Sequence, residues 1–207
     1  MKTQVEPASF AFDEVSEAGV AKAISRYPVG KQASAVMALL DIAQRQMARQ
    51  TGSAWIPRVA MDVIASRLGM APVRVYEVVT FYLMYNTKPV GKYHLQVCTT
   101  TPCWLRGSDD VVSACKKVSG ISEFGETSSD GLFTMTEVEC LGGCVNAPIL
   151  QINDDYYEDV DGAHAEELLA RLKAGEALPQ PGSVIGRHAS APIEGQTALL
   201  NQTGSAE

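Results

Sequence analysis

The sequence predicts a protein of mixed α and β structure, of the α+β or α/β class, with an N-terminal helical bundle followed by a mixed-sheet domain. Apolar residues recur at helical spacing in the first part of the chain, whereas segments with strand character alternate with helical segments in the second part. From these two observations we expect an extended arm over 1–15, a helical domain over 16–87, a sheet domain over 88–180 and an extended tail over 181–207.

The helical domain is marked by apolar periodicity and by start and stop residues. The apolar residues of its longest helix lie at the spacing of one helical face: Val36, Leu39, Leu40, Ala43 and Met47. Gly52 follows as a stop signal, and Pro57 is expected at the first position of a short helix that Gly69 closes. Pro72 opens a further helix over 72–86. Its apolar residues occupy more than one face, so we expect this helix to be buried on two sides.

The sheet domain alternates between strand and helix signals. The expected order is a strand over 93–98, a helix over 108–120, a strand over 132–140, a hairpin over 149–160 and a final helix over 162–174. Ser108 is expected to cap the first helix, a short Asp154–Asp155 turn to close the hairpin, and Asp161 and Gly175 to bound the last helix. The tail is rich in Gly, Pro, Ser and Ala, so it cannot build a core of its own.

Charge and hydropathy argue against two kinds of partner. The formal net charge is -7 and the pI is near 5.0, whereas binding to nucleic-acid phosphates requires a basic surface. The expected helices 57–68 and 72–86 are therefore interpreted as part of the bundle and not as a DNA-binding helix-turn-helix. No apolar run reaches the roughly 20 residues that cross a bilayer, and the N-terminus has no signal- or transit-peptide pattern. We expect no direct membrane insertion, and we expect the chain to stay in a reducing cytoplasm.

Four of the five cysteines form two closely spaced pairs, Cys98 with Cys103 and Cys140 with Cys144. The spacing is C-x4-C, then 36 residues, then C-x3-C. Each pair follows an expected strand, so neighbouring strands would bring four thiolates to one edge of the sheet. This spacing favours a two-iron cluster, in which each iron takes two thiolates. A zinc site and a redox dithiol remain alternatives, although the C-x-x-C of a thioredoxin-type dithiol is absent. An odd cysteine count without a secretion signal argues against disulfides.

The residues between these cysteines suit a cluster that carries negative charge. Gly142 and Gly143 allow the backbone to approach closely and to take unusual dihedral angles. The hydroxyl groups of Thr99, Thr100 and Thr101 can donate hydrogen bonds to sulfur. Both sets of residues also occur as ordinary turn residues.

The other reactive side chains indicate no chemistry of their own. Cys115 lies inside an expected helix among apolar neighbours, so we expect a buried and inert thiol. The three histidines, His94, His164 and His188, show no pairing with a cysteine nucleophile, and no G-x-G-x-x-G or P-loop motif is present. We therefore expect no catalytic residue in this chain and no nucleotide site.

Two stretches of the sequence carry a family resemblance: AMDVIASRLGMAPVRVYEVVTFYLMYNTKPVGKYHLQVCTTTPCWLRGS and FTMTEVECLGGCVNAPILQINDDYYEDV. They closely resemble the flavoprotein 2 family, the E-type subunits of NADH:quinone oxidoreductase (respiratory complex I), from about residue 16 to about residue 185. The resemblance implies a helical domain followed by a thioredoxin-like domain with one [2Fe-2S] cluster. It also implies that the ligands of this cluster are Cys98, Cys103, Cys140 and Cys144.

The resemblance further implies a function within an assembly. It makes the chain an electron-transfer subunit of the NADH dehydrogenase module, whose cluster exchanges an electron with the flavin of a neighbouring subunit. FMN and NADH would be bound by that partner, and the large iron–sulfur subunit would be a second partner. The assembly would be a proton-translocating quinone reductase, with this chain in a peripheral arm on the cytoplasmic side of the bacterial inner membrane. The alternatives are the equivalent subunit of an NAD-linked hydrogenase or formate dehydrogenase, or a zinc-stapled structural module.

Overall fold

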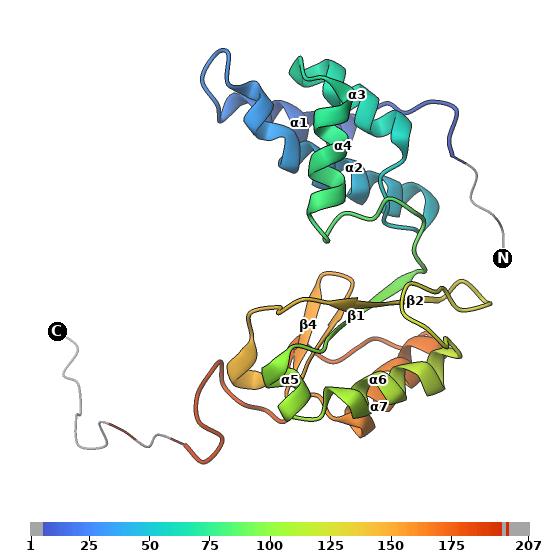
Figure 1. Ribbon diagram of the computed structural model, residues 1–207, viewed down its shortest axis with the longest axis vertical. Coiled ribbons are helices and arrows are strands. Elements are labelled where there is room, and N and C mark those ends of the chain that lie inside the picture. The colour runs from blue at the N-terminus through green and yellow to red at the C-terminus, as the bar shows by residue number, and fades with distance from the viewer. Residues whose placement is uncertain (1–5, 196–197, 199–207) are drawn as a thin grey trace. The chain divides into compact units, whose positions relative to one another are not determined.

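The structure is a computed structural model, in which residues 6–195 and residue 198 are described. The chain divides into two compact units (Figure 1): Met1–Lys92 with Ser129–Phe133, and Tyr93–Ser128 with Thr134–Glu207. None of the helices in the described residues is long and apolar enough to cross a membrane. The residue ranges expected for the arm, the two domains and the tail stay predictions.

The first unit is a bundle of helices, as the apolar periodicity predicts. Its elements are α1 (Glu14–Ser25), the 3-10 helix η1 (Gln32–Ala35), α2 (Val36–Thr51), α3 (Arg58–Leu68) and α4 (Pro72–Phe81). The five apolar positions predicted to form one face of α2 are all buried. Gly52 and Gly69 end α2 and α3 in the left-handed conformation, which confirms both stop signals.

Helix α1 covers Glu14–Ser25, and Phe10 and Phe12 before it pack against the helical core, with their two rings edge to face with each other. Two boundaries in this unit differ from the expectation. Pro57 occupies the N-cap position of α3 and not the first helical position. Helix α4 ends at Phe81 and not at residue 86, since the next residue has extended backbone.

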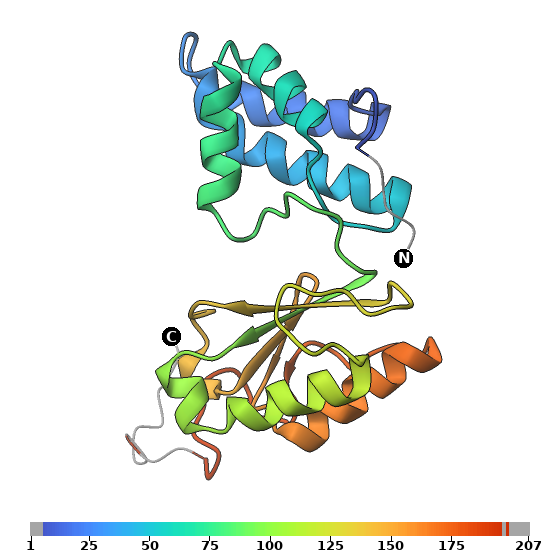
Figure 2. The ribbon, with the colours of Figure 1, turned by 45° about the vertical axis from the view of Figure 1, so that its right-hand side comes forward.

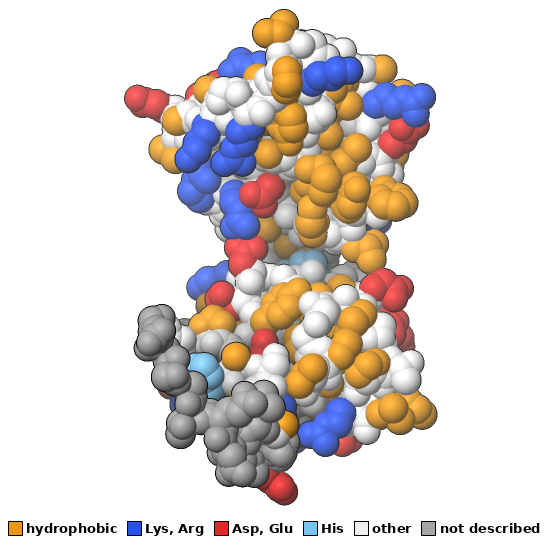
Figure 3. Space-filling view, turned by 90° about the vertical axis from the view of Figure 1, so that its left-hand side faces the viewer, with side chains coloured by type: hydrophobic (Ala, Val, Ile, Leu, Met, Phe, Trp, Pro, Cys, Tyr) orange, Lys and Arg blue, Asp and Glu red, His pale blue; other side chains and the backbone are white. Residues whose placement is uncertain are grey.

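The expectation that α4 is buried on two sides is wrong within the described structure. Only Val75 and Val79, one helical turn apart, are buried. Large apolar side chains on its other faces and just beyond its end are exposed: Val73, Tyr76, Phe81, Tyr82, Leu83 and Met84. Figure 3 shows hydrophobic side chains gathered on one face of the helical unit. A single buried stripe therefore holds α4 in the bundle, and the rest of its apolar surface faces outward.

The second unit is a five-stranded mixed sheet covered by two helices. Its strands are β1 (Tyr93–Cys98), β2 (Phe133–Val138), β3 (Ile149–Ile152), β4 (Asp155–Glu158) and β5 (Gly182–Ser183), in the order β2-β1-β3-β4-β5. Strand β3 is antiparallel to β1 and to β4, and β5 is parallel to β4. Its helices are α5 (Thr101–Leu105), α6 (Ser108–Ser119), the 3-10 helix η2 (Cys144–Asn146) and α7 (Gly162–Ala174). Helices α6 and α7 lie on the same face of the sheet (Figure 2).

Local signals in this unit are mostly confirmed. The first strand covers the expected residues, and α7 begins after Asp161, whose carboxylate accepts a hydrogen bond from the His164 amide at 2.8 Å. Gly175 ends α7 in the left-handed conformation, as expected. The order strand, helix, strand, strand, strand, helix is therefore the observed order of the main elements, and a short strand β5 follows it.

Two local predictions in the sheet unit are wrong by one residue. Gly107, with a φ of 96°, occupies the N-cap position of α6, and Ser108 is instead a buried residue of the first helical turn. The hairpin turns at Asn153–Asp154 and not at Asp154–Asp155, because Asn153 takes the left-handed conformation that turns require and Asp155 already pairs with Ile152.

His94 lies in β1 and is buried next to β2. Its Nε2 atom lies 2.8 Å from the Thr136 hydroxyl oxygen. Burial lowers the pKa of His94 to about 4, because a charged imidazolium would lose its hydration there. The folded protein therefore favours the neutral form of the His94 imidazole.

We predict that His94 makes the protein less stable in acid. The unfolded chain binds a proton at His94 near pH 6.5, whereas the folded chain binds it only near pH 4. Stability is therefore lost as the pH falls between these values, by about 2 kcal/mol at pH 5, and is unaffected above this window. Urea unfolding at pH 7.5 and at pH 5 measures this loss. His94→Gln keeps a partner for Thr136 but does not titrate, so an equally large acid loss in this variant would contradict the prediction.

Candidate metal centre

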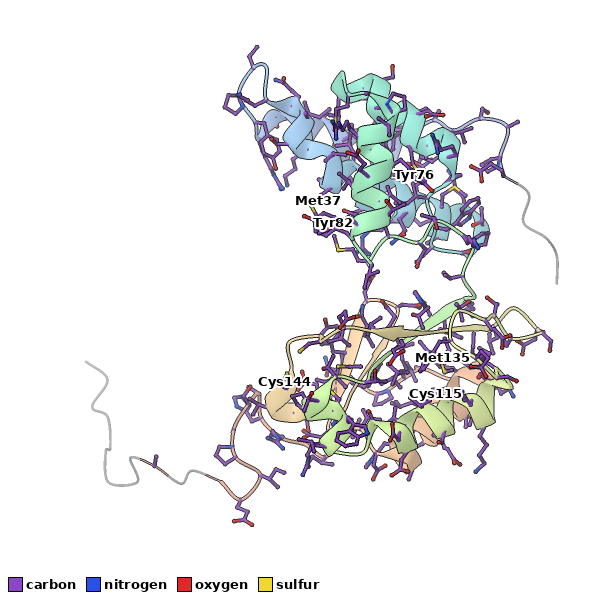
Figure 4. The ribbon with its side chains drawn as sticks, in the orientation of Figure 1. Met37, Tyr76, Tyr82, Cys115, Met135 and Cys144 are labelled. Atoms are coloured by element: carbon purple, nitrogen blue, oxygen red, sulfur yellow. The ribbon has the colours of Figure 1, made fainter. Side chains whose placement is uncertain are left out.

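Two neighbouring strands deliver the cysteine loops to one end of the sheet. Strand β1 ends at Cys98, and the chain then enters α5, which carries Cys103. Strand β2 lies next to β1, and the loop after it carries Cys140 and leads into η2, which begins at Cys144. Figure 4 shows Cys144 at this end, with Cys115 farther away on α6. The structure thus brings together the four predicted cysteines and leaves Cys115 out.

The four sulfurs form two pairs. The sulfur atoms of Cys140 and Cys144 are 3.2 Å apart, and the thiols of Cys98 and Cys103 are hydrogen-bonded to each other. Cys98 and Cys103 are each only 1% exposed, whereas Cys140 is exposed and Cys144 is half-buried. All four thiols are free. The site therefore has a buried side, formed by the first pair, and an open side, formed by the second.

Hydrogen-bond donors surround the Cys98 sulfur. The Thr100 Oγ1 atom lies 3.2 Å from this sulfur, and the backbone amides of Leu141 and Thr100 also donate to it. Burial raises the pKa of the Cys98 thiol, but these hydrogen bonds outweigh burial and hold the pKa below its usual value. The buried side of the site is thus built to carry a thiolate.

The other sulfurs also receive backbone donors. The pKa of Cys140 is lowered by a hydrogen bond from the Cys144 thiol and by another from the Gly142 amide. Burial raises the pKa of Cys103 to about 12, although the Ile149 amide donates to its sulfur and opposes this shift. Amide donors from the loop after β2 and from β3 therefore point at the sulfurs. Such donors stabilise anionic sulfur in metal sites.

Gly142 and Gly143 serve the site in different ways. Gly142 has a φ of 86°, a conformation that residues with a side chain rarely adopt, and its amide reaches Cys140. Gly143 is needed for space, because a Cβ atom there would lie 2.4 Å from the Cδ1 atom of Ile149. Ile149 is buried in a small core with Cys98, so the sheet and the loop after β2 meet at Gly143. Both glycines therefore do more than turn the chain.

Of the three threonines after β1, Thr100 is the one whose hydroxyl lies near a cysteine sulfur in the part of the chain that the structure describes. The Thr99 hydroxyl instead donates to the Glu137 carboxylate, and Thr101 is the first residue of α5. The sequence predicted donors in this loop, but it could not tell which of three identical side chains points at the sulfur.

The donor set fits a binuclear cluster. In the described residues, no group of three or more His, Cys, Asp or Glu side chains that could hold a metal ion is present. Four thiols in two pairs match a centre in which two irons are each held by two thiolates. The buried pair and the amide donors also suit a group that carries net negative charge.

The sequence profile of the thioredoxin-like [2Fe-2S] ferredoxin family matches residues 20–173. The chain belongs to this family. This thioredoxin-like [2Fe-2S] ferredoxin is 49% identical over 169 residues to the E-type subunit of the NADH-quinone oxidoreductase of Rickettsia typhi, covering 82% of this chain and 96% of the relative. It is 43% identical over 195 residues to the mitochondrial NADH dehydrogenase [ubiquinone] flavoprotein 2 of Dictyostelium discoideum, covering 94% of this chain and 76% of that protein.

A solved structure shares the fold of this thioredoxin-like [2Fe-2S] ferredoxin. A chain of an NAD+-reducing [NiFe]-hydrogenase in the H2-reduced state superimposes with a TM-score of 0.55 at 18% sequence identity. The match covers 68% of the present chain but only 22% of the hydrogenase chain. At this identity the likeness concerns the fold alone.

Apolar side chains on the two cysteine loops were missed in the sequence. Trp104 and Leu105 follow Cys103, Val145 follows Cys144, and all three side chains are exposed. Their position one or two residues after a cysteine was the available signal. The chain therefore presents an apolar rim, formed by these three residues, on the segments that carry its cysteines.

We predict an order of thiol reactivity in protein stripped of iron. Cys140 is exposed and has a lowered pKa, so it should react with an alkylating reagent faster than a buried thiol. Cys103 and Cys115 are buried, and burial raises the pKa of each to about 12. A time course with iodoacetamide, read by peptide mass spectrometry, should label Cys140 well before Cys115. The reverse order would show that the described burial is not that of the protein in solution.

Proposed function

We propose that this chain is an electron-transfer subunit of an NADH-oxidising respiratory complex. Cys98, Cys103, Cys140 and Cys144 hold one [2Fe-2S] cluster, and this cluster exchanges an electron with the flavin of a neighbouring NADH-binding subunit. The proposal is supported by the relatives named as E-type subunits of NADH-quinone oxidoreductase, one of which is matched over 96% of its length. It makes the chain part of an oxidoreductase, without substrate chemistry of its own.

The observation that carries the proposal is the pairing of four free thiols at the ends of two adjacent strands. A bound [2Fe-2S] cluster supplies one-electron redox chemistry. The residues of this chain supply the thiolates, which must lose their protons when metal binds. The Thr100 hydroxyl and the amides of Leu141 and Gly142 stabilise the resulting charge. The burial of Cys98 and Cys103 excludes water from one side.

The open side of the site is the proposed route for the electron. Cys140 is exposed, and the apolar rim formed by Trp104, Leu105 and Val145 lies beside the two cysteine loops. Exposed apolar side chains around a functional group are typical of a protein interface. The partner that binds FMN and NADH therefore docks at this rim and brings the flavin toward the open pair.

The helical unit serves assembly in this proposal. Helix α4 and the residues after it expose an apolar surface that includes Phe81, which is 76% exposed, whereas Tyr85 belongs to the core and donates its hydroxyl to the Met37 carbonyl. The large iron–sulfur subunit is the second proposed partner. The assembly is placed in a peripheral arm on the cytoplasmic side of the bacterial inner membrane. We propose the division into arm, helical domain, cluster domain and tail on the same basis.

Two alternatives keep the fold and change the function. One is the equivalent subunit of an NAD-linked hydrogenase or formate dehydrogenase, and a chain of an NAD+-reducing [NiFe]-hydrogenase shares the fold. Purification of the native complex distinguishes these enzymes from the proposed function, since only the respiratory complex couples NADH oxidation to quinone reduction. The other alternative is a module in which zinc holds the four thiolates, and metal content distinguishes it.

The deciding experiment measures iron, sulfide and zinc in anaerobically purified full-length protein, followed by low-temperature electron paramagnetic resonance after dithionite. About two irons and two sulfides per chain with one spin-half signal are expected for a [2Fe-2S] centre. One zinc per chain and no signal would replace electron transfer with a structural role.

Substitution of single cysteines tests the ligand assignment. Cys98→Ser or Cys144→Ser should lose most of the iron and change or abolish the resonance signal, because each removes one of four thiolates. Cys115→Ser is the matched control, since Cys115 is a free buried thiol outside the site, and it should keep wild-type iron content. Wild-type iron in the first two variants, or loss of iron in the third, would reverse the assignment.

A further inference from the structure

The C-terminal segment packs against the turn that carries Cys144. After α7 the chain returns to the sheet as β5, beside β4, and then runs past η2. The Asn146 Nδ2 atom donates a hydrogen bond to the carbonyl of Ala189 at 2.9 Å, and it also donates to the Glu158 carboxylate. Residues 187–189 are therefore fastened to the loop of the second cysteine pair.

A buried ion pair forms the centre of this attachment. The Arg187 Nη2 atom lies 2.9 Å from the Asp159 Oδ1 atom, and these side chains are only 8% and 3% exposed. The Ser183 hydroxyl donates to the other Asp159 oxygen at 2.7 Å and accepts from the Arg187 amide at 3.2 Å. By contrast, the pair of Arg171 with Glu167 on α7 lies at the surface. A buried pair of this kind leaves an uncompensated charge when one partner is removed.

Arg187 and Asp159 also donate hydrogen bonds to the backbone that follows Cys144. Arg187 donates from Nη1 to the Val145 carbonyl at 3.3 Å. The Asp159 amide donates to the Asn146 carbonyl at 2.7 Å. The two consecutive carbonyls after Cys144 are thus each held by a hydrogen bond from this pair. The buried pair of cysteines does not need such hydrogen bonds, because Cys98 ends a strand and is packed in a core.

We propose that Arg187 and Asp159 form a latch that positions Cys144 and sets the electrostatic balance beside the cluster. The inference rests on the proposed function, since the cluster is the group whose ligand the latch holds. The latch fixes the turn of the more exposed cysteine pair, and it places one positive and one negative charge against the peptides next to a ligand. Arg187 and Asp159 are therefore positioning residues that act through Cys144.

The latch predicts opposite effects of its two charges on the reduction potential. In Arg187→Gln an unpaired carboxylate remains near a centre that gains an electron, so the potential should become more negative. In Asp159→Asn an unpaired guanidinium remains, so the potential should become less negative. Both variants loosen the turn, so both should release iron to a chelator several-fold faster than wild type. A merely structural role would not give potential shifts of opposite sign.

The test uses the full-length protein with its cluster, titrated by electron paramagnetic resonance and challenged with an iron chelator. Arg171→Gln is the matched control, because it makes the same charge change at an exposed pair of the same unit, and it should leave both readouts unchanged. Ser183→Ala, which removes only one hydroxyl from the latch, serves if the charge variants do not fold, and it should also speed iron release. Shifts of the same sign in the two charge variants, or wild-type iron release in all latch variants, would overturn the proposal.

Hydrogen exchange separates this inference from the proposed function. In protein stripped of iron, Arg187→Gln should increase exchange of the amides of Asn146 and Asp159, but not of those in α7. If wild-type protein binds no [2Fe-2S] cluster, the proposed function fails while this readout still tests the clamp. Unchanged exchange at both amides would show that the pair does not hold the turn.

Discussion

If the proposed function is correct, the sheet unit meets one electrostatic constraint: several anionic sulfurs have to be held at one end of a sheet. Four thiolates repel one another, and burial of two of them adds a cost of desolvation. Adjacent strands bring the sulfurs together, and the chain then leaves each strand in a tight loop whose amides face inward. The left-handed conformation of Gly142 lets its amide reach the Cys140 sulfur, and the missing side chain at Gly143 leaves room for Ile149. Helices α6 and α7 support the sheet behind it.

Local sequence signals predict many of the helix ends and strand bounds of this architecture. Glycines after α2, α3 and α7 end those helices in the left-handed conformation, and the strand that ends at Cys98 has the expected bounds. The four cysteines could be grouped from spacing because strand neighbours share an edge. The prediction that Ser108 caps α6 was wrong, although serine is a common N-cap residue. Gly107 with its positive φ is the N-cap, so the helix begins one residue earlier than a cap at Ser108 would allow.

What the sequence could not predict depends on contacts between distant residues. The apolar residues of α4 have the pattern of a helix buried on two sides, yet among the described residues only one stripe is buried, because a pattern does not distinguish the core from an interface. The tail has a composition typical of disorder, but two charges, Arg187 and Asp159, 28 residues apart, find each other in a buried position. Burial of a distant ion pair leaves no local periodicity.

The attachment of residues 187–189 to the turn at Cys144 also affects the order in which the site forms during translation. The cysteine turn at Cys144 is held by residues up to Ala189, whereas the first strand of the site is complete once Cys98 has been synthesised. During translation the ribosome therefore exposes the thiols before it releases the segment that holds their turn. The turn at Cys144 takes its final form only after residues up to Ala189 have left the ribosome.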